Sequence, residues 1–579
     1  MHQSQHILEE ICELNRQFPR DMLCRICEKR QCVPFRQLQK LIGGNSRNFS
    51  SKKPPPESEW KEPKEGFKTG INVWNTLAKK KVRLILKNKN QLSWYMCGPT
   101  VYDSAHIGHA SSYIRFDIIR RVLENYFDIE VDQVMGITDI DDKIIYKANR
   151  TKTPFVEVAK KYEMEFLQDM EKLNILPATR LTRVSDHIQP ILEYIQKIID
   201  NGLAYTADNG SVYFDVIKYG RYGKLWTHSM ETEVRATGDQ FKKHPRDFAL
   251  WKGVKPGEPY WESPWGDGRP GWHIECSTMA SGVFGSNFDF HSGGNDLMFP
   301  HHENELAQSQ AHYNCHQWVN YWLHSGHLHL SGDAIKMSKS RQNVLTISDF
   351  LDHFTANQFR MFCLLTPYRH YIEYSDVIMK KSAAIYEHFT NCINMCDAYV
   401  KGQILCEPIN EAELQNCINE TRQGILEALA DDFLTENVIS SMQNLTKILY
   451  KSFAKDTTCS VVRSPATVST AGVLLQSTLN KLGFNLRLKG TSSNMDGVKL
   501  DSVIENLVDL RDTVRQFALH PPDNIFTDVA EEDTKEEEKR RKKLMSPLLN
   551  KCDKVRDNLK SVNISIGDLK KTSLWKVDK

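Results

Sequence analysis

The sequence lacks the marks of two large classes of protein. Its 579 residues contain no apolar run that approaches the roughly 18–20 residues needed to span a membrane. The net charge is only +2, with 26% charged residues, so no general basic excess points to a nucleic-acid partner. That balance still leaves room for a local basic face. We therefore expect a soluble globular protein with no membrane partner.

A second CxxC pair is also missing. Cys24–Cys27 has metal-like spacing, but no matching pair follows to complete a zinc site, and we interpret it as incidental. The 14 cysteines are scattered, as in an intracellular protein whose thiols are mostly buried and apolar. Cys392 and Cys396 are expected in the core of a helical bundle because their spacing places them on one helix face.

The N-terminal region changes character at Met22. Residues 1–21 are acidic, which is wrong for a targeting peptide, whereas 22–53 is basic, poor in acids and contains serines. This profile is typical of a mitochondrial transit peptide and predicts the mitochondrial matrix. The alternative is a disordered basic tail, and the sequence leaves open whether Met1 or Met22 is the start.

The length predicts three or four domains, because a domain holds about 150 residues. A charged, Pro-rich stretch at 52–65 is expected to be a linker, and the chain becomes globular near Gly70. The predicted parts are an N-terminal extension at 1–69, an α/β domain in two halves at 70–171 and 250–346, an inserted subdomain at 172–249, a helical bundle at 347–455, a linker at 456–500 and a C-terminal region at 501–579.

The first half of the α/β domain carries a strand–loop–helix–strand pattern. Leu92–Met96 and Val131–Thr138 are predicted strands, and between them an apolar stripe from Ile114 to Tyr126 predicts a helix. This order favours a βαβ unit in a doubly wound, Rossmann-like sheet. Residues Trp272–Asp289 are expected to be strand-like and loop-rich, with helices after Pro300.

The chain after Ile347 is expected to be helical. One late helix is predicted from the stripe of Val503, Leu507, Leu510, Val514 and Phe517, with Ser502 and Glu505 as its capping box. The charged segment 531–543 is interpreted as an exposed helix, since its opposite charges recur every four residues.

Two short motifs predict handling of a phosphate. His106-Ile107-Gly108-His109 lies where a strand gives way to a helix, and a helix N-terminus attracts anions. Lys336-Met337-Ser338-Lys339-Ser340 offers two lysines that can neutralise charge at a reacting phosphate. Taken alone, the histidine motif is a weak signal and the lysine motif could be an ordinary surface loop. Together, in this order, they resemble the HIGH and KMSKS signatures of class I aminoacyl-tRNA synthetases, which activate an amino acid with ATP.

The stretch F-P-H-H-E-N-E predicts a metal site. On a helix, His301 and Glu305 share one face, and with Cys97 and Cys276 they form a plausible tetrahedral zinc set. The alternative is a solvent-exposed helix start that binds no metal, with acidic residues near its positive end.

A set of motifs between about Val73 and Asp376 is similar to those of the cysteinyl-tRNA synthetases, in that family's order: C-G-P-T-V-Y, T-D-I-D-D-K-I-I, D-F-A-L-W-K, S-P-W-G-D-G-R-P-G-W-H-I-E-C-S, F-P-H-H-E-N-E and K-M-S-K-S. The resemblance implies one zinc ion held by Cys97, Cys276, His301 and Glu305, with the substrate thiol as a further ligand. It also implies ATP with Mg²⁺, L-cysteine and tRNA(Cys) as substrates, and the basic leader resembles that of mitochondrial members.

The resemblance also assigns roles to single residues. Gly98, Thr138 and His301 would contact the substrate cysteine, with Trp272 and His291 as pocket walls. His106, Gly108 and His109 would hold ATP, and Lys336 and Lys339 would join the two histidines as catalytic residues, Lys339 stabilising the transition state of adenylate formation. Zinc selection would make an editing site unnecessary, because shape alone separates serine from cysteine by only about a hundredfold, and soft thiolates prefer zinc.

Two departures from the family pattern stand out. Ser292 replaces a glycine of H-G-G-G, which we interpret as benign. Tyr146 replaces the second lysine of K-I-I-K after Lys143, which weakens the case for the family's pyridoxal-phosphate-dependent cysteine persulfide side activity.

The remaining residues are interpreted as candidate tRNA contacts or as structural residues. Val555–Trp575 resembles the family's terminal module that contacts the anticodon, and Asp553, Asp568 and Trp575 are the candidate tRNA contacts. The other polar residues of the same histidine-rich segments are interpreted as structural or capping: His302, Glu303, His324, His327 and His329. The sequence does not decide between a monomer and a homodimer.

Three rival functions remain. A ligase that joins cysteine to an amino sugar would share the zinc and ATP motifs but would not need 501–579 or a leader. A catalytically silent RNA-binding paralogue is disfavoured by the intact His106, His109, Lys336 and Lys339. Another amino-acid specificity is disfavoured by the four-ligand set beside the first motif.

Overall fold

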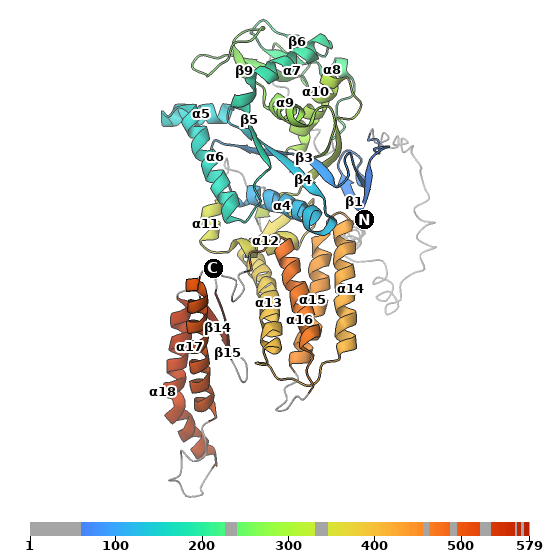
Figure 1. The fold of residues 1–579 in the computed structure, drawn as a ribbon. Helices are drawn as coiled ribbons and strands as arrows, with labels where there is room; N and C mark the ends of the chain where they lie inside the picture. Colours follow the sequence, from blue (N-terminus) through green and yellow to red (C-terminus); the bar gives the residue numbers. More distant parts are fainter. Residues whose placement is uncertain are drawn as a thin grey trace, which may run out of the picture. The chain divides into compact units, whose positions relative to one another are not determined.

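The computed structural model describes residues 60–225, 240–330, 345–454, 462–486, 495–520, 534–561, 564–568 and 573–577. At its centre is a five-stranded sheet in the order β11-β10-β3-β4-β5, in which every pair is parallel (Figure 1). Its strands are β3 (Gln91–Thr100), β4 (Glu130–Thr138), β5 (Arg180–Arg183), β10 (Phe288–Gly294) and β11 (Val319–Ser325). The predicted doubly wound α/β fold is confirmed.

The predicted βαβ unit is also confirmed. Helix α4 (Ile107–Phe127) connects β3 to β4, and its residues Ile114, Ile118 and Val122 are buried. The sheet order reverses between β3 and β10, and in open sheets of this kind ligands bind at such a reversal, beyond the carboxyl ends of the strands. The β3–β4 register also shifts between Cys97 and Thr100, at this same end.

Smaller elements frame the sheet. The antiparallel hairpin of β1 (Phe67–Asn75) and β2 (Lys80–Leu86) precedes β3, and helices α5 (Asp142–Thr151) and α6 (Phe155–Lys172) follow β4. The short parallel pair β12 (Leu328–Leu330) and β13 (Ile372–Tyr374) follows β11.

The inserted subdomain exists, but its predicted limits of 172–249 are wrong. Strand β5 lies within that range and belongs to the central sheet. The insertion contains a four-stranded antiparallel sheet whose strands pair in sequence order. Its last strand ends at Pro270, so the insertion continues past residue 249. Its elements are η1 (Val184–His187), α7 (Ile188–Asp200), β6 (Ala204–Thr206), β7 (Val212–Phe214), α8 (Val216–Tyr219), β8 (Phe248–Gly253) and β9 (Gly268–Pro270).

The strand-like prediction for Trp272–Asp289 is wrong over most of its length. Helix α9 (Trp272–Phe284) occupies it, and only the end of the range enters β10. Eight residues of α9 are buried, so the helix has no polar face from which an amphipathic period could be read. The helical prediction after Pro300 is confirmed by η3 (Met298–His302) and α10 (Glu303–Tyr313).

The predicted helical bundle extends beyond its predicted end. It contains α11 (Ile347–Leu351), α12 (Ala356–Leu364), α13 (Asp376–Val400), α14 (Glu411–Ala430), α15 (Thr435–Phe453) and α16 (Pro465–Lys481). Helix α16 packs on α13 and α14, so the linker predicted at 456–500 is wrong for that helix. As expected, Cys392 and Cys396 lie in the bundle core.

The C-terminal region forms a small module of two helices and a hairpin: α17 (Met495–Leu519), α18 (Thr534–Lys560), β14 (Ile564–Asp568) and β15 (Ser573–Val577). Both predicted helices are confirmed, but α17 begins before Ser502, so the capping box predicted there is wrong. The module buries Ile504 and Val508 rather than the predicted stripe, of which Val503 and Leu510 are each 62% exposed. Among the described residues, no helix is both long and apolar enough to cross a bilayer.

Candidate metal centre and nucleotide site

Four elements bring the predicted zinc ligands together at the reversal point of the sheet. Cys97 lies near the end of β3, and Cys276 lies on α9, 179 residues later in the chain. His301 lies in η3 and Glu305 in the first turn of α10, where a carboxylate is favoured by the helix dipole. All four side chains are buried, and their ligand atoms lie within 4.8 Å of one another.

The spacing of these atoms fits a tetrahedral zinc ion. With metal–sulfur bonds of about 2.3 Å and a metal–oxygen bond of about 2.1 Å, two sulfurs are about 3.8 Å apart and a sulfur–oxygen pair about 3.6 Å. The Cys97 and Cys276 sulfurs are 3.7 Å apart. Cys97 Sγ lies 3.6 Å from Glu305 Oε1. His301 Nε2 lies 3.0 Å from that oxygen, which is closer than the roughly 3.4 Å expected for two ligands of a tetrahedral zinc ion.

The electrostatics of the cluster suit a cation. The hydrogen bond from the Cys97 thiol lowers the pKa of Cys276 to about 6, against the effect of burial. Burial opposes ionisation of Glu305 as well, yet His291 and His301 lower its pKa to about 2. Although burial alone would lower it, the pKa of His301 rises to about 10 because Glu305 and Cys276 are close. Buried thiolate and carboxylate therefore surround the place that a metal ion would occupy.

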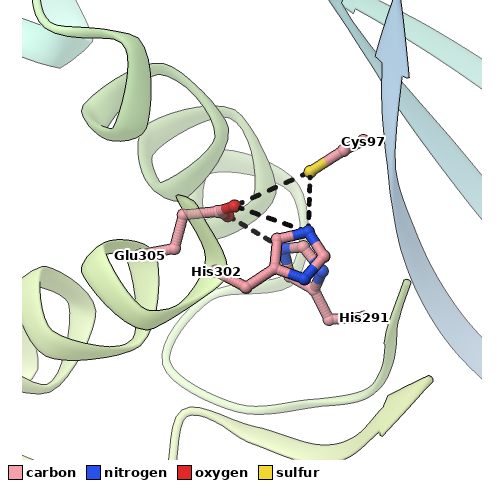
Figure 2. Close-up of side chains that lie close together, drawn as sticks. All are labelled: Cys97, His291, His302 and Glu305. Atoms are coloured by element: carbon pink, nitrogen blue, oxygen red, sulfur yellow. Dashed lines mark hydrogen bonds and ion pairs between the residues drawn. The ribbon is translucent and has the colours of Figure 1, made fainter. Parts of the chain in front are cut away.

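A second group of potential ligands shares two members with the first. Cys97, His291, His302 and Glu305 also place their ligand atoms within 4.8 Å of one another (Figure 2). His291 Nε2 lies 2.8 Å from Glu305 Oε2, and Cys97 Sγ lies 3.3 Å from His302 Nε2. Sequence reasoning classed His302 as structural and His291 as a pocket wall. Neighbouring histidines in F-P-H-H were the one signal that could have pointed to this group.

Two of the histidines interpreted as structural, His302 and His324, form a chain of contacts beside the cluster. His302 Nδ1 lies 2.7 Å from His324 Nε2, and His324 Nδ1 lies 2.8 Å from the Thr76 hydroxyl. Burial and the surrounding histidines hold the pKa of His302 well below its ordinary value, so its ring is neutral. Such contacts fix ring orientation, as partners of metal ligands commonly do.

The residues predicted to contact cysteine lie around the same cluster. Gly98 follows Cys97, and a methyl group at its Cα would overlap the Gly136 carbonyl of β4. The Thr138 hydroxyl donates to Glu275 Oε2 over 3.1 Å, and the Trp272 ring lies 4.4 Å from the His301 ring, centre to centre. His291 is fully buried, and its Nε2 lies 2.8 Å from Glu305 Oε2.

The first phosphate motif forms the N-terminus of α4. The side chain of His106 caps the helix by accepting a hydrogen bond from the Gly108 N–H at 3.1 Å through Nδ1. That acceptor role places the proton of the neutral ring on Nε2. The His106 and His109 rings are stacked with centres 3.7 Å apart. Two imidazoles and a helix N-terminus thus lie just beyond the end of β3, as an anion site requires.

The second phosphate motif, with Lys336 and Lys339, lies outside the described residues. The chain on its C-terminal side is described and lies beside the first motif. The Leu345 carbonyl accepts from the Ile107 N–H at 3.1 Å, and Thr346 forms a β-bridge with His106. The segment that follows the lysine motif is therefore hydrogen-bonded to the histidine motif.

The Lys143–Tyr146 motif lies on α5. Tyr146 is 68% exposed, and the Lys143 ammonium lies 5.2 Å from the centre of the Tyr102 ring. Because residue 146 is a tyrosine, it cannot supply a second amine to bind pyridoxal phosphate.

Two of the three candidate tRNA contacts serve the interior of the C-terminal module. Asp568 pairs with Arg511 Nη1 at 2.6 Å and accepts from the Ser573 hydroxyl at 2.7 Å. Trp575 is 3% exposed and packs with Ile504 and Val508, so its ring offers no face to an RNA base. Only Asp553 lies at the surface, where it pairs with Arg556.

Comparisons with known proteins agree with this geometry. A family model described as the class I (C) tRNA synthetase catalytic domain matches residues 84–384. The probable mitochondrial cysteine–tRNA ligase of Xenopus tropicalis is 43% identical over 90% of this chain and 92% of its own. The cytoplasmic cysteine–tRNA ligase of Dictyostelium discoideum is 38% identical over 93% of this chain and 82% of its own.

Among solved structures, methionyl-tRNA synthetase of Mycobacterium tuberculosis bound by methionyl-adenylate shares the fold, with a TM-score of 0.50. The two are 14% identical over 68% of this chain and 90% of that one. The family model extends through both halves of the α/β domain. This chain belongs to the cysteine–tRNA ligases, which are class I aminoacyl-tRNA synthetases.

Proposed function

We propose that this cysteine–tRNA ligase selects its amino acid through a zinc ion held by Cys97, Cys276, His301 and Glu305, and that it serves mitochondrial translation. The observation that carries the zinc proposal is the 3.7 Å separation of two buried sulfurs beside a buried imidazole and carboxylate. When bound there, zinc supplies a soft Lewis acid that binds a thiolate strongly and a neutral hydroxyl weakly.

The surrounding residues hold cysteine for reaction. Gly98 leaves backbone room beside Cys97, and Thr138 is fixed by its hydrogen bond to Glu275. His301 is kept in place by Glu305 on one nitrogen and by His273 on the other, with its Nδ1 2.9 Å from His273 Nδ1. These contacts orient the amino acid without any acid–base step, because its carboxylate is already a nucleophile.

Adenylate formation takes place at the N-terminus of α4. His106 and His109 hold the ATP phosphates with the positive end of the helix, and Lys336 and Lys339 stabilise the charge that develops at the α-phosphate. The residues that follow the lysine motif in the chain, Leu345 and Thr346, pair with Ile107 and His106 and so lie beside the proposed phosphate site. Positioning and charge neutralisation are the main contributions to rate.

Removal of the metal tests the zinc proposal. Dialysis against a strong chelator should abolish cysteine-dependent ATP–pyrophosphate exchange, and one equivalent of zinc should restore it. Serine should support no exchange in either state, since a hydroxyl cannot replace the thiol at zinc. Full exchange in protein that holds no metal would contradict the proposal. Charging of tRNA(Cys) would in turn exclude the rival that ligates an amino sugar.

The mitochondrial assignment rests on the basic segment 22–53 and on the similarity to a mitochondrial relative, although a cytoplasmic relative is nearly as similar. A fluorescent reporter fused to residues 22–60 is expected to enter the mitochondrial matrix. A matched fusion in which the arginines of that segment are replaced by glutamine should stay in the cytosol. Cytosolic location of both fusions would contradict the assignment.

The C-terminal module is proposed to bind the tRNA anticodon, with Asp553 and its surface as the remaining candidate contact.

The stability of this module depends on Asp568. Burial raises the pKa of this carboxyl, but Arg511 and Ser573 lower it from 3.8 to about 2. A folded-state pKa below the unfolded value contributes stability above about pH 4, and this contribution is lost as the pH falls from about 4 to 2.

The substitution Asp568→Asn should therefore make the amides of α17 exchange faster with deuterium, by the same factor at pH 5 and at pH 7. The variant should keep ATP–pyrophosphate exchange and lose charging of tRNA(Cys). Asp553→Asn is the matched control for stability, because Asp553 is about half exposed and its pair with Arg556 contributes little. Unchanged protection of α17 in Asp568→Asn would contradict the prediction.

A further inference from the structure

A buried arginine of helix α4 lies where two distant segments of the chain meet. Arg115 is 2% exposed, and its Nη1 donates to the carbonyls of Gly326, Tyr368 and His370 at 3.0, 2.9 and 3.0 Å. Its Nε and Nη2 have no hydrogen-bond partner among the described residues. A guanidinium keeps its charge at physiological pH, and its removal from water is costly, so this position calls for an explanation.

The two segments meet backbone against backbone. The Gly326 N–H donates to the Tyr368 carbonyl at 2.9 Å, and a methyl group on Gly326 would overlap the His370 carbonyl. Three carbonyl oxygens lie within 3.0 Å of one nitrogen of Arg115. Partial negative charges gathered in this way repel one another unless a cation lies between them. Arg115 supplies that cation and so stabilises the contact.

This contact lies where the chain leaves the central sheet. Gly326 directly follows β11 and leads into β12, whereas Tyr368 and His370 lie just before β13, the parallel partner of β12. The second segment is itself held, because Asp432 accepts from the Tyr368 hydroxyl at 3.3 Å and from Arg369 Nε at 2.9 Å. Arg115 therefore joins the start of β12 to a segment whose position is fixed.

The described chain on each side of the lysine motif is attached to α4. Before the motif, β12 ends at Leu330, six residues ahead of Lys336, and Arg115 bonds to the chain where this strand begins. After the motif, the Leu345 carbonyl accepts from the Ile107 N–H at 3.1 Å. Ile107 and Arg115 are eight residues apart on one helix, which separates the two attachments by about 12 Å along its axis.

We infer that Arg115 is a positioning residue for adenylate formation, because it fixes the chain that leads to the lysine motif relative to the histidine motif on the same helix. The inference rests on the proposed phosphate site. Stabilisation of a transition state by fixed charges depends on their placement, and a displacement of about 1 Å caused far from the reacting atoms can cost about a hundredfold in rate.

The substitution Arg115→Met removes the charge and the donors and keeps an unbranched side chain. In the full-length, zinc-loaded protein, single-turnover formation of cysteinyl-adenylate should slow by about a hundredfold, with the KM for cysteine and for ATP unchanged. Transfer of cysteine from the bound adenylate to tRNA(Cys) should keep its rate. A single-turnover rate constant does not depend on the fraction of protein that is folded, so loss of stability alone cannot produce this result.

Two further variants separate position from packing. Arg115→Lys keeps a cation with three N–H donors, one for each carbonyl, and should recover most of the rate. Gly326→Ala leaves Arg115 in place but displaces the same contact through the His370 carbonyl, so it should slow the same step alone. The control is Asp117→Asn, which removes a buried charge two residues away on α4 and should lower stability without changing the adenylate rate constant.

The inference is overturned if Arg115→Met forms adenylate at the wild-type rate, if it slows both steps equally, or if Asp117→Asn slows adenylate formation as much. Gly326→Ala decides the question by the same measurements should Arg115→Met yield no folded protein. Wild-type adenylate formation in Lys339→Ala would instead overturn the proposed phosphate site.

Discussion

Replacement of Cys276 by serine should remove zinc and abolish cysteine activation. The hydroxyl is neutral at pH 7, whereas the pKa of Cys276 is lowered to about 6 by its hydrogen bond with Cys97, so the variant loses a ligand that is already ionised. Loss of a direct ligand should exceed the roughly 10–100-fold cost of losing an outer partner. Zinc content by mass spectrometry and cysteine-dependent ATP–pyrophosphate exchange should both fall to background.

A matched control separates this effect from general damage to the core. Cys363 is a free, buried thiol on α12, where its sulfur lies 4.0 Å from the Ser111 hydroxyl. Cys363→Ser should keep one zinc per chain and normal exchange. Equal loss of zinc in both variants would show that the substitutions had disrupted folding of the protein as a whole. Normal zinc content in Cys276→Ser would remove this residue from the proposed ligand set.

The substitution Asp117→Asn should destabilise the catalytic region by about 3–5 kcal/mol. Arg360 Nη1 lies 2.5 Å from Asp117 Oδ2, and both side chains are 1% exposed. Arg121 bonds the same oxygen at 2.8 Å. Without the carboxylate, Arg360 becomes a buried cation whose remaining partners are backbone carbonyls, and breaking such a pair costs about 3–5 kcal/mol.

Urea unfolding followed by tryptophan fluorescence can measure this cost, because Trp94 and Trp322 are fully buried in the central sheet. The surface pair Lys401–Asp397 is the control, since its atoms are 3.0 Å apart but both side chains are about half exposed. Asp397→Asn should change stability by less than about 1 kcal/mol. Equal, small effects of the two substitutions would contradict the assignment of Asp117 as a buried anchor.

The chemistry of the site could be predicted from the sequence because it depends on the types of residues and their local order. His301 and Glu305 are four residues apart on consecutive helical turns, so their separation along the chain is enough to place their side chains next to each other. The histidine motif follows β3 after a five-residue loop and opens α4, so its place at a helix N-terminus follows from the local order of strand, loop and helix. Strand, loop, helix and strand in sequence were enough to predict the parallel β3–β4 pair.

Other features could not be read in this way. Helix α9 was expected to be strand-like because it is buried on nearly all sides and shows no amphipathic period. The apolar stripe of α17 predicted a helix but not its buried face, and the structure buries Ile504 and Val508 instead of Val503 and Leu510. A period shows which residues share a face, whereas the neighbouring elements decide which face is covered.

The sequence by itself determined the family motifs, the identities of the four proposed ligands and the helix that begins at Ile107. Only the tertiary structure decided that the sulfurs of Cys97 and Cys276 lie 3.7 Å apart and that His302 and His291 form a second group around Glu305. The physical reason is that these contacts arise from strand order and helix packing between residues far apart in the chain, and local patterns carry no information about either.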